Sequence, residues 1–290
     1  MKSIGIDIGG TSIKGALFND NVIVREISKE TNGKLGKDKI IESLLQVINQ
    51  LFDSEIRYIG IDSAGNINPQ SGECVYASNN LVGWTGFNIR EYIAHIFNVP
   101  VYVENDAVAA LIAEVSQLSQ QEQKQNICML TIGTGLGCSI MEDSKIDYGT
   151  NFDGGSYAHL CVNPNGMKCD CGKIGCAEKE LSATGLYYYG QREISSLISV
   201  EELFSLYRIK DPRAIKVLEE YGDKMNLYIQ MLVDLKHIDI LIIGGGVSMS
   251  KDILKKLIKK NIKIVYAKHG NRAGIIGANL LGKLQNETCQ

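Results

Sequence analysis

The stretch IGIDIGGTSIKGALFND, residues 4–20, has the pattern of a strand, a tight turn and a second strand. Isoleucines recur at every second position of the first strand, and Gly9-Gly10-Thr11 supplies the turn. The stretch ICMLTIGTGLGCSIM, residues 127–141, repeats this plan around the turn Gly133-Thr134-Gly135. Short glycine-rich hairpins also resemble one another by chance. The repetition nevertheless favours two structurally similar halves, each of which begins with such a hairpin.

Helices and strands alternate through the rest of both halves. Apolar residues at helical spacing predict helices, and short runs of β-branched residues predict buried strands. The predicted helices cover residues 38–52, 88–97, 201–207 and 213–235 and begin again at about 273, and the predicted strands cover 58–62, 101–103, 238–243 and 262–266. Strands followed by helices in this order predict an α/β protein with one mixed sheet in each half.

The composition is that of a globular protein of two domains. The chain has 290 residues, of which 44% are hydrophobic and 22% are charged, and its net charge is -3. Such a balance argues against the broad basic face of a nucleic-acid-binding protein, and no apolar run is long enough to cross a bilayer. The first residues, MKSIGIDIGG, lack a signal-peptide pattern. We therefore expect a cytoplasmic protein without a nucleic-acid or membrane partner.

The first hairpin carries the groups that an Mg–nucleotide complex requires. Gly9 and Gly10 let backbone amides approach phosphate oxygens, and Thr11 adds a hydroxyl group. Asp7 is suited to hold Mg²⁺ through water, and Lys14 supplies an ammonium group. The alternative is an ordinary hairpin with a surface lysine. Because a second glycine–threonine turn begins the other half, we favour nucleotide binding, and since neither turn opens a helix, neither is a Walker or dinucleotide loop.

A candidate catalytic base follows the predicted strand at 101–103, where Glu104-Asn105-Asp106 leads into a helix. Open α/β sheets bind their ligands at the carboxyl ends of strands, which is where Asn105 and Asp106 fall. Both residue types also cap helices, and the local sequence alone favours that role. The chain also has nucleotide-type turns and needs a base, so we predict that Asp106 is catalytic.

Four residues have the chemistry of a structural zinc site. One imidazole and three thiolates can close a tetrahedron around Zn²⁺ and leave no position for water. The predicted ligands are His159, Cys169, Cys171 and Cys176, and the alternative is a set of free thiols. The other cysteines are scattered, and we expect most of them to be small buried residues. They are Cys74, Cys128, Cys138, Cys161 and Cys289.

Taken together, these motifs resemble the ROK family of bacterial sugar kinases and related repressors. The match runs in order along almost the whole chain, and the segment of the predicted zinc ligands is its most specific part. The matching motifs are DIGGT at 7–11, ENDA at 104–107, IGTGLG at 132–137, His159 with CxCGxxGC at 169–176, GGGVS at 244–248 and AGIIGA at 273–278.

The resemblance implies an actin-like, hexokinase-like ATPase fold, in which two ribonuclease-H-like domains flank a cleft that holds the active site. The first domain would cover residues 1–114, and the C-terminal helix, at about 275–290, would pack back on it. The second domain would cover residues 115–274 and contain the zinc loop 159–176. Proteins of the family are often dimers, so a homodimer is expected.

The resemblance also implies roles for individual residues, with ATP, Mg²⁺ and a structural Zn²⁺ as cofactors. Asp106 would be the base. The first phosphate site would consist of Asp7, Gly9, Gly10, Thr11 and Lys14, the second of Gly133, Thr134 and Gly135, and the residues near adenosine would be Gly244, Gly245 and Gly246. The sugar would be bound by Asn80, Asn105, Asp106, His159 and Glu178.

The function implied is that of an ATP-dependent kinase acting on a primary hydroxyl, the 6-OH, of a hexose or hexose derivative. One alternative is a kinase of N-acetylmannosamine or another amino sugar. A second is a sugar-binding regulatory protein of the same family with little kinase activity.

Two departures from the family pattern bear on these alternatives. The family's repressors carry a helix-turn-helix domain ahead of the first hairpin, which here begins at residue 4, so we expect no DNA-binding role. The family pattern Gly-Glu-x-Gly-His is replaced by Gly155-Ser156-Tyr157-Ala158-His159. Ser156 thus occupies the position at which such kinases use a glutamate to bind the hydroxyls at the C1/C2 end of the sugar. This difference leaves the identity of the sugar open.

Overall fold

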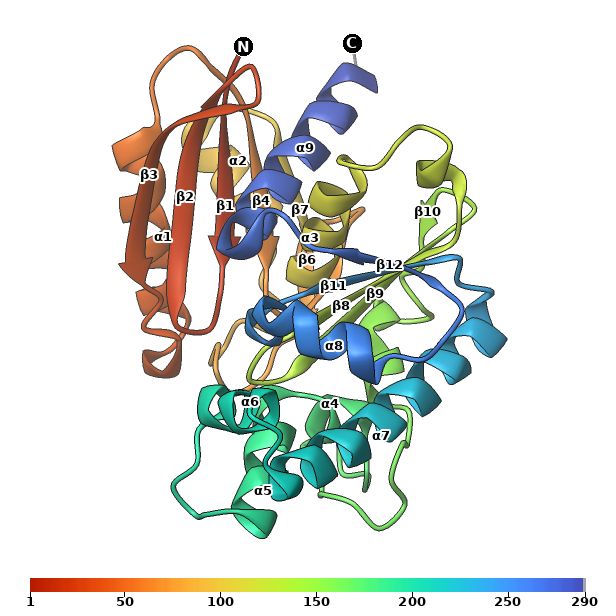
Figure 1. Ribbon diagram of the computed structural model, residues 1–290. Helices are drawn as coiled ribbons and strands as arrows, with labels where there is room; N and C mark the ends of the chain where they lie inside the picture. The colour runs from red at the N-terminus through yellow and green to blue at the C-terminus, as the bar shows by residue number, and fades with distance from the viewer. Residues whose placement is uncertain (289–290) are drawn as a thin grey trace. The chain divides into compact units, whose positions relative to one another are not determined.

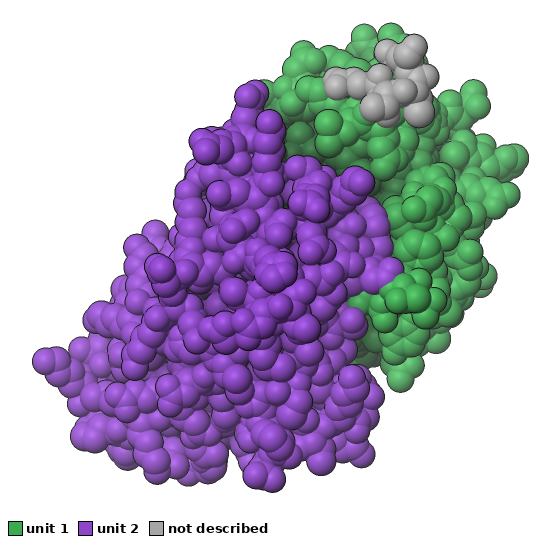
Figure 2. Space-filling view, turned by 90° about the vertical axis from the view of Figure 1, so that its right-hand side faces the viewer, with its two compact units in different colours: residues 1–118, 150–153, 271–290 green, residues 119–149, 154–270 purple. Residues whose placement is uncertain are grey.

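The computed structural model describes residues 1–288, which form two compact units (Figure 2). Unit 1 contains Met1–Leu118, Thr150–Asp153 and the segment from Asn271 onward. Unit 2 contains Ser119–Gly149 and Gly154–Gly270. The chain therefore returns to unit 1 with its C-terminal helix.

Unit 1 is built on a five-stranded sheet in the order β3-β2-β1-β4-β7. The hairpin strands β1, β2 and β3 are antiparallel, whereas β1, β4 and β7 are parallel. The strands are β1 (Lys2–Ile8), β2 (Ser12–Asn19), β3 (Val22–Glu30), β4 (Ile56–Ser63) and β7 (Val101–Asn105). The helices of this unit are α1 (Lys37–Leu51), α2 (Ile89–Phe97), α3 (Asp106–Val115) and α9 (Ala273–Thr288).

Helix α9 lies across β1 and β4, and glycines on these two strands let it approach closely (Figure 1). A Cβ atom on Gly5 would lie 2.5 Å from the carbonyl oxygen of Ile275. A Cβ atom on Gly60 would collide with the carbonyl oxygen of Ala278. Side chains alternate between the two faces of a strand, so residues two positions beyond these glycines also face α9. Those residues are Asp7 and Asp62.

Unit 2 contains a second five-stranded sheet with the same topology, in the order β10-β9-β8-β11-β12. Its antiparallel strands are β8 (Ile127–Ile132), β9 (Leu136–Glu142) and β10 (Lys145–Ile146), and β11 (Ile240–Gly244) and β12 (Lys263–Tyr266) extend it in parallel. The helices are α4 (Ala177–Glu180), α5 (Ala183–Glu193), α6 (Val200–Arg208), α7 (Pro212–Lys236) and α8 (Lys251–Leu257). The two sheets thus have matching strand orders and directions, and the predicted α/β fold class is confirmed.

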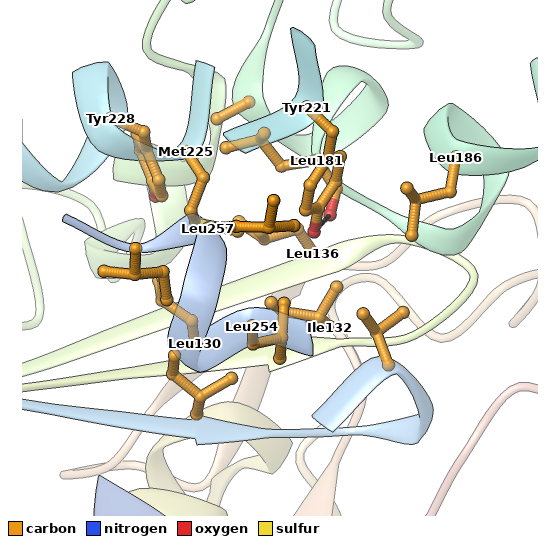
Figure 3. Packing of buried hydrophobic residues seen from close by; sticks show 14 of the residues in the cluster. Leu130, Ile132, Leu136, Leu181, Leu186, Tyr221, Met225, Tyr228, Leu254 and Leu257 are labelled. Carbon is orange, nitrogen blue, oxygen red and sulfur yellow. Dashed lines mark hydrogen bonds between the residues drawn. The ribbon is translucent and has the colours of Figure 1, made fainter. Parts of the chain in front are cut away.

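The core of unit 2 joins this sheet to its helices (Figure 3). Leu130 and Ile132 of β8 pack in one cluster with Tyr221 and Met225 of α7. All four side chains are almost completely buried, and burial of a side chain of this size contributes roughly 1.5–3 kcal/mol. The hydroxyl of Tyr221 donates to the carbonyl oxygen of Leu181 at 2.9 Å, which satisfies its polar end.

Several elements were not predicted from the sequence. They are the short hairpin of β5 (Asn66–Asn68) and β6 (Glu73–Tyr76), strand β10, and helices α4 and α5. Helix α5 contains Gly185 and Gly190 and three consecutive tyrosines, which obscure its apolar period. Of those tyrosines, Tyr189 is buried, whereas Tyr187 and Tyr188 are exposed.

The expectation that most of the scattered cysteines are buried holds for three of the four that are described. These three are Cys74, Cys128 and Cys138, whereas Cys161 is exposed and Cys289 lies outside the described residues. Cys161 forms an isolated β-bridge with Cys176, at the loop of the candidate zinc ligands. Among residues 1–288, no helix combines the length and the apolar character that a membrane span requires.

Candidate functional site

The carboxyl ends of three parallel strands bring acidic residues together in unit 1. Strand register pairs Asp7 of β1 with Asp62 of β4, and Asp62 in turn with Glu104 of β7. Asp106 follows directly as the first residue of α3. The charges of Asp7 and Asp106 both act on Asp62, whose pKa is raised well above its usual value, mainly by burial. The sequence-predicted Asp7 and Asp106 therefore share this edge with Asp62, which was not predicted.

The first glycine turn lies at the same edge, between β1 and β2. Its geometry is held by the Thr31 hydroxyl, which donates to the Gly9 carbonyl oxygen at 2.6 Å, while Gly10 and Thr11 are exposed. A Cβ atom on Gly10 would lie 3.3 Å from Cβ of Asn80. The structure thus brings the predicted phosphate turn next to the predicted sugar residue Asn80.

Lys14 adds a positive charge beside this turn. Nζ of Lys14 lies 3.2 Å from Oδ2 of Asp7. The pair is partly exposed, with side-chain exposures of 35% and 16%, so the ammonium group can contact an anion from solvent without breaking away from the sheet. The five residues predicted for the first phosphate site therefore lie together.

The sequence did not decide whether Asn105 or Asp106 caps the helix, and in the structure the cap is Asn105. Oδ1 of Asn105 accepts hydrogen bonds from the backbone amides of Ala107 and Val108 at 2.9 and 3.1 Å, which makes Asn105 the N-cap of α3. Nδ2 of Asn105 donates to the carbonyl oxygen of Gly65 at 2.8 Å and to Oδ1 of Asp106 at 3.0 Å. Asn105 therefore caps the helix and orients the carboxyl group of Asp106.

The carboxyl group of Asp106 has the properties of a general base near neutral pH. Burial raises its pKa to about 6, and the charge of Asp7 acts in the same direction. The amide of Ala107 donates to Oδ1 at 2.8 Å and partly opposes this shift. A base with a pKa just below the working pH is ionised and still accepts a proton readily.

In unit 2, the second glycine turn is hydrogen-bonded to the beginning of α5. The amide of Ala183 donates to the carbonyl oxygen of Gly133 at 2.8 Å, and the hydroxyl of Thr184 donates to that of Thr134 at 2.7 Å. A Cβ atom on Gly135 would lie 3.4 Å from Oε1 of Glu178. Sequence reasoning missed Ala183 and Thr184, because α5 itself was not predicted.

The third glycine run is adjacent to this turn. Strands β8 and β11 are parallel, so their carboxyl ends coincide, with Gly244 paired to Thr131. Gly245 has a φ of 82° and lies against the backbone of Ile132, so a side chain there would be both strained and obstructed. Unit 2 therefore presents both of its predicted nucleotide-binding turns, Gly133–Gly135 and Gly244–Gly246, at one edge of its sheet.

The four predicted metal ligands converge in unit 2. One potential ligand atom from each of His159, Cys169, Cys171 and Cys176 lies within 4.8 Å of the others. The Sγ atoms of Cys171 and Cys176 are 3.6 Å apart, as are Sγ of Cys169 and Nδ1 of His159. In a tetrahedral site with Zn–S of about 2.3 Å, ligand atoms are separated by roughly 3.5–3.8 Å. The donor set and its spacing fit Zn²⁺.

Glu178 lies between this cluster and the second glycine turn. Its Oε2 atom is 3.1 Å from Sγ of Cys169 and 3.5 Å from Nδ1 of His159. The residue belongs to α4, the short helix that begins directly after Cys176. The position of Glu178 therefore depends on the folding of the cysteine loop.

Ser156 lies in a short 3-10 helix, Gly154–His159, that ends at the first predicted metal ligand. Its side chain is exposed, and its neighbour Tyr157 is anchored by a hydrogen bond from its hydroxyl to Asp147 at 2.9 Å. A longer side chain at position 156 would therefore extend from a fixed backbone.

These features define the class of protein. Each unit has the ribonuclease-H-like sheet, and the chain as a whole has the actin-like, hexokinase-like ATPase fold. More particularly, the chain belongs to the ROK family, whose sequence profile matches residues 3–284.

Relatives of nearly full length are known. A glucokinase of Halalkalibacterium halodurans is 28% identical over 321 aligned residues, covering 99% of this chain and 96% of that protein. An N-acetylmannosamine kinase of Haemophilus influenzae is 28% identical, covering 96% of this chain and 94% of that protein. The crystal structure of the ROK hexokinase from Thermus thermophilus has a TM-score of 0.83 at 25% identity, covering 99% of this chain and 100% of that one.

Proposed function

We propose that this protein is an ATP-dependent sugar kinase that phosphorylates a primary hydroxyl, the 6-OH, of a hexose or hexose derivative. The observation that carries the proposal is the carboxyl group of Asp106, held at the edge of the sheet that also bears the Gly9–Thr11 turn. This arrangement supports a base and a phosphate-binding turn working on one reaction. The relatives named glucokinase and N-acetylmannosamine kinase support the same chemistry.

In this mechanism Asp106 accepts the proton of the sugar hydroxyl as the oxygen forms a bond to the γ-phosphorus. The bond from that phosphorus to the bridging oxygen of ADP breaks in the same step. Asn105 acts by holding the carboxyl group of Asp106 through its 3.0 Å hydrogen bond. Lys14 and the backbone of the Gly9–Thr11 turn stabilise charge on the transferred phosphoryl group. Mg²⁺, held near Asp7, would neutralise further phosphate charge.

Unit 2 carries the other residues that the family resemblance assigns to the nucleotide and the sugar. We assign a second phosphate contact to Gly133–Gly135 and the adenosine contact to Gly244–Gly246, because no atom lies within 4 Å of a Cβ position on Gly133 or Gly246, which leaves room there for a ligand. His159 directs Nδ1 toward Cys169, which leaves its Nε2 atom for a sugar hydroxyl, and Glu178 would accept from another. Zn²⁺, held by His159 and the cysteines of its loop, would have a structural role only.

The experiment that tests this function is ADP release on addition of a panel of sugars with Mg-ATP. The panel contains glucose, mannose, N-acetylmannosamine, N-acetylglucosamine and glycosides of glucose. We expect ADP release that depends on a sugar and a phosphorylated product with the phosphate on the primary hydroxyl. Tight sugar binding by calorimetry without any ADP release would instead identify a regulatory protein.

We further propose that the preferred substrate is modified at the C1/C2 end. A glutamate at position 156 would accept charge-assisted hydrogen bonds from sugar hydroxyls, worth roughly 1.5–3 kcal/mol each when buried. Ser156 is too short to replace them, and its exposed position leaves space for a substituent such as an acylated amine or a glycosidic partner.

Replacing Ser156 with glutamate should therefore change specificity. We expect Ser156→Glu to raise kcat/KM for free glucose by about tenfold or more, since one buried charge-assisted bond is worth that much, and to lower kcat/KM for the modified sugar. Ser196→Glu, at an exposed serine elsewhere in unit 2, is the matched control and should change neither value. The proposal would be contradicted if the wild-type enzyme had a micromolar KM for glucose and Ser156→Glu only lowered its kcat/KM.

The pH dependence of turnover follows from the ionisation of Asp106. The pKa of this carboxyl group is raised to about 6, and only its ionised form accepts a proton. We therefore expect kcat/KM to fall as pH decreases through about 6 and to be constant above pH 7. Rates measured from pH 5 to pH 8 with saturating Mg-ATP test this, and a flat profile over that range would show that ionisation of Asp106 does not limit turnover.

We also propose that the chain forms a homodimer, as the family resemblance implies. Leu197 and Ile209 are strongly exposed large apolar residues of unit 2, at 87% and 76%, and such side chains are common at subunit contacts. Light scattering at micromolar concentration would measure the mass in solution.

A further inference from the structure

Glu180 is a buried acidic residue of unit 2 that the proposed mechanism does not use. It is the last residue of α4, and its side chain has 0% exposure. Helix α4 packs against α5 and α7 (Figure 1), and the loop 159–176 leads directly into it. A completely buried carboxylate is costly unless hydrogen bonds and an opposite charge compensate it, so the partners of Glu180 indicate what it holds in place.

Two of these partners belong to the loop 159–176. The amide of Met167 donates to Oε1 of Glu180 at 2.6 Å, and Nδ2 of Asn163 donates to Oε2 at 3.0 Å. The carbonyl oxygen of Met167 accepts in turn from the amide of Gly175 at 2.8 Å. The carboxyl group therefore binds one side of the loop directly and is connected to the other side through Met167.

The other two partners come from α5 and α7. The hydroxyl of Tyr189, on α5, donates to Oε2 of Glu180, and Nζ of Lys224, on α7, lies 3.5 Å from the same oxygen. Nζ of Lys224 also donates to the hydroxyl of Tyr189 at 2.8 Å and to Oε1 of Glu220 at 2.7 Å. Glu180 thus joins the loop to two helices of the unit 2 core, and the ammonium group of Lys224 balances its charge.

Glu178 lies between two such attachment points on α4. Cys176, the N-cap of the helix and a proposed zinc ligand, precedes Glu178 by two residues, and Glu180 follows it by two. A helix of four residues has little stability of its own, so the contacts at its two ends decide where its middle lies. The position of Glu178 therefore depends on Glu180 as well as on the cysteine cluster.

We propose that Glu180 is a positioning residue that holds α4 and the loop 159–176 in place independently of the metal. It acts on the sugar site through Glu178 and on the zinc site through Met167 and Asn163. The effect on the sugar rests on the proposed function, whereas the effect on zinc affinity does not. The proposed base, Asp106, belongs to unit 1, so kcat should depend little on Glu180.

The first test is Glu180→Gln, which keeps the size of the side chain but leaves Nδ2 of Asn163 without its carboxylate acceptor. When zinc-loaded protein is titrated with a chromogenic chelator, the Kd for Zn²⁺ should be raised by about tenfold or more. The KM for the sugar should rise by about tenfold, while kcat at saturating sugar changes by less than about twofold. Glu219→Gln, at an exposed glutamate of α7, is the matched control and should change none of these values.

A double-mutant cycle separates positioning from a general loss of stability. If Glu180 acts on the sugar through Glu178, the variant with both Glu178→Gln and Glu180→Gln should have the same calorimetric sugar Kd as Glu178→Gln alone. Additive effects of the two substitutions would show that Glu180 does not position Glu178, and this would overturn the proposal.

If Glu180→Gln does not fold, Tyr189→Phe replaces it, because it removes one donor to the carboxyl group and keeps the buried ring. It should raise the Kd for Zn²⁺ and the KM for the sugar by about twofold or more, the effect of one neutral hydrogen bond. A folded variant with both values unchanged would overturn the proposal. Absence of sugar binding by the wild-type protein would contradict the proposed function instead, and the zinc affinities would still decide whether Glu180 holds the loop.

Discussion

Asp106→Asn should lower kcat by about 10²–10⁴-fold while sugar binding and the fold are retained. The substitution removes the group that accepts the hydroxyl proton but preserves its size. The amide oxygen of the new side chain can still accept from the Ala107 amide, which lies 2.8 Å from Oδ1 in the structure. The measurement is kcat from ADP release, with calorimetric sugar affinity and Tm determined on the same preparations.

The Tm of Asp106→Asn shows whether the variant is folded. The pKa of Asp106 in the folded chain, about 6, lies above the ordinary value of 3.8, so the folded state loses stability as pH rises through this window. Above pH 7 the ionised carboxyl group is destabilising, and Asp106→Asn should have a Tm equal to or higher than that of the wild type. Asp252→Asn, in the first turn of α8, is the matched control and should keep its activity. A kcat above a tenth of the wild-type value would mean that Asp106 is not the base.

The sequence alone could not assign the roles of helix cap and oriented carboxyl group to Asn105 and Asp106. Asparagine and aspartate both cap helices, and a local sequence does not show which of two adjacent residues is the N-cap. In the structure Asn105 donates with both amide hydrogens and accepts from two backbone amides. The two backbone amides that donate to its Oδ1 atom identify Asn105 as the cap, and its bonds to Gly65 and Asp106 fix the amide group that orients the Asp106 carboxyl group.

The strands that position the site were predictable because their residues alternate or are uniformly apolar. Asp62 was missed although a signal was present, since the tetrapeptide Ile-Gly-Ile-Asp occurs at both 4–7 and 59–62. Identical tetrapeptides on parallel neighbouring strands bring their acids side by side only when the register matches. Register depends on the loop and helix between the strands, which a local pattern does not contain.

Helix α5 was missed for a different reason. Its first turn is stabilised by tertiary contacts, in which Ala183 and Thr184 bind the carbonyl oxygens of the second glycine turn. Its buried Tyr189 is held by a hydrogen bond to Glu180 and by Lys224, which lies 4.0 Å from the centre of the ring. Lys224 and the second glycine turn lie far from α5 along the chain, so the helix forms because of packing that helical propensity does not anticipate.

Removal of zinc should cause the second large effect, a loss of stability together with a loss of sugar affinity. Zn²⁺ bound by His159, Cys169, Cys171 and Cys176 would link the 3-10 helix at Gly154–His159 to the beginning of α4. Without it, the four side chains lose the partner that joins them, and the loop loses its main constraint. A loss of about 3 kcal/mol would lower Tm by roughly 6–12 °C.

Sugar affinity should fall with stability, because the loop holds two proposed sugar ligands. His159 is one of the proposed metal ligands, and Glu178 lies two residues beyond another, Cys176. Each sugar hydrogen bond that is lost should weaken binding by about tenfold or more. We expect elemental analysis to give one Zn²⁺ per chain, and Cys171→Ser to lower zinc content, Tm and sugar affinity together.

Cys161→Ser is the matched control for the zinc experiment, because Cys161 is an exposed cysteine beside the same loop but outside the cluster. It should change none of the three values. Purified wild-type protein without metal and with all three cluster thiols freely titratable would contradict the zinc site itself. A lower Tm with unchanged sugar affinity would instead restrict the metal to stabilising unit 2, since His159 and Glu178 would then keep their positions through backbone contacts such as that of the Ala177 amide with the Leu160 carbonyl oxygen at 2.9 Å.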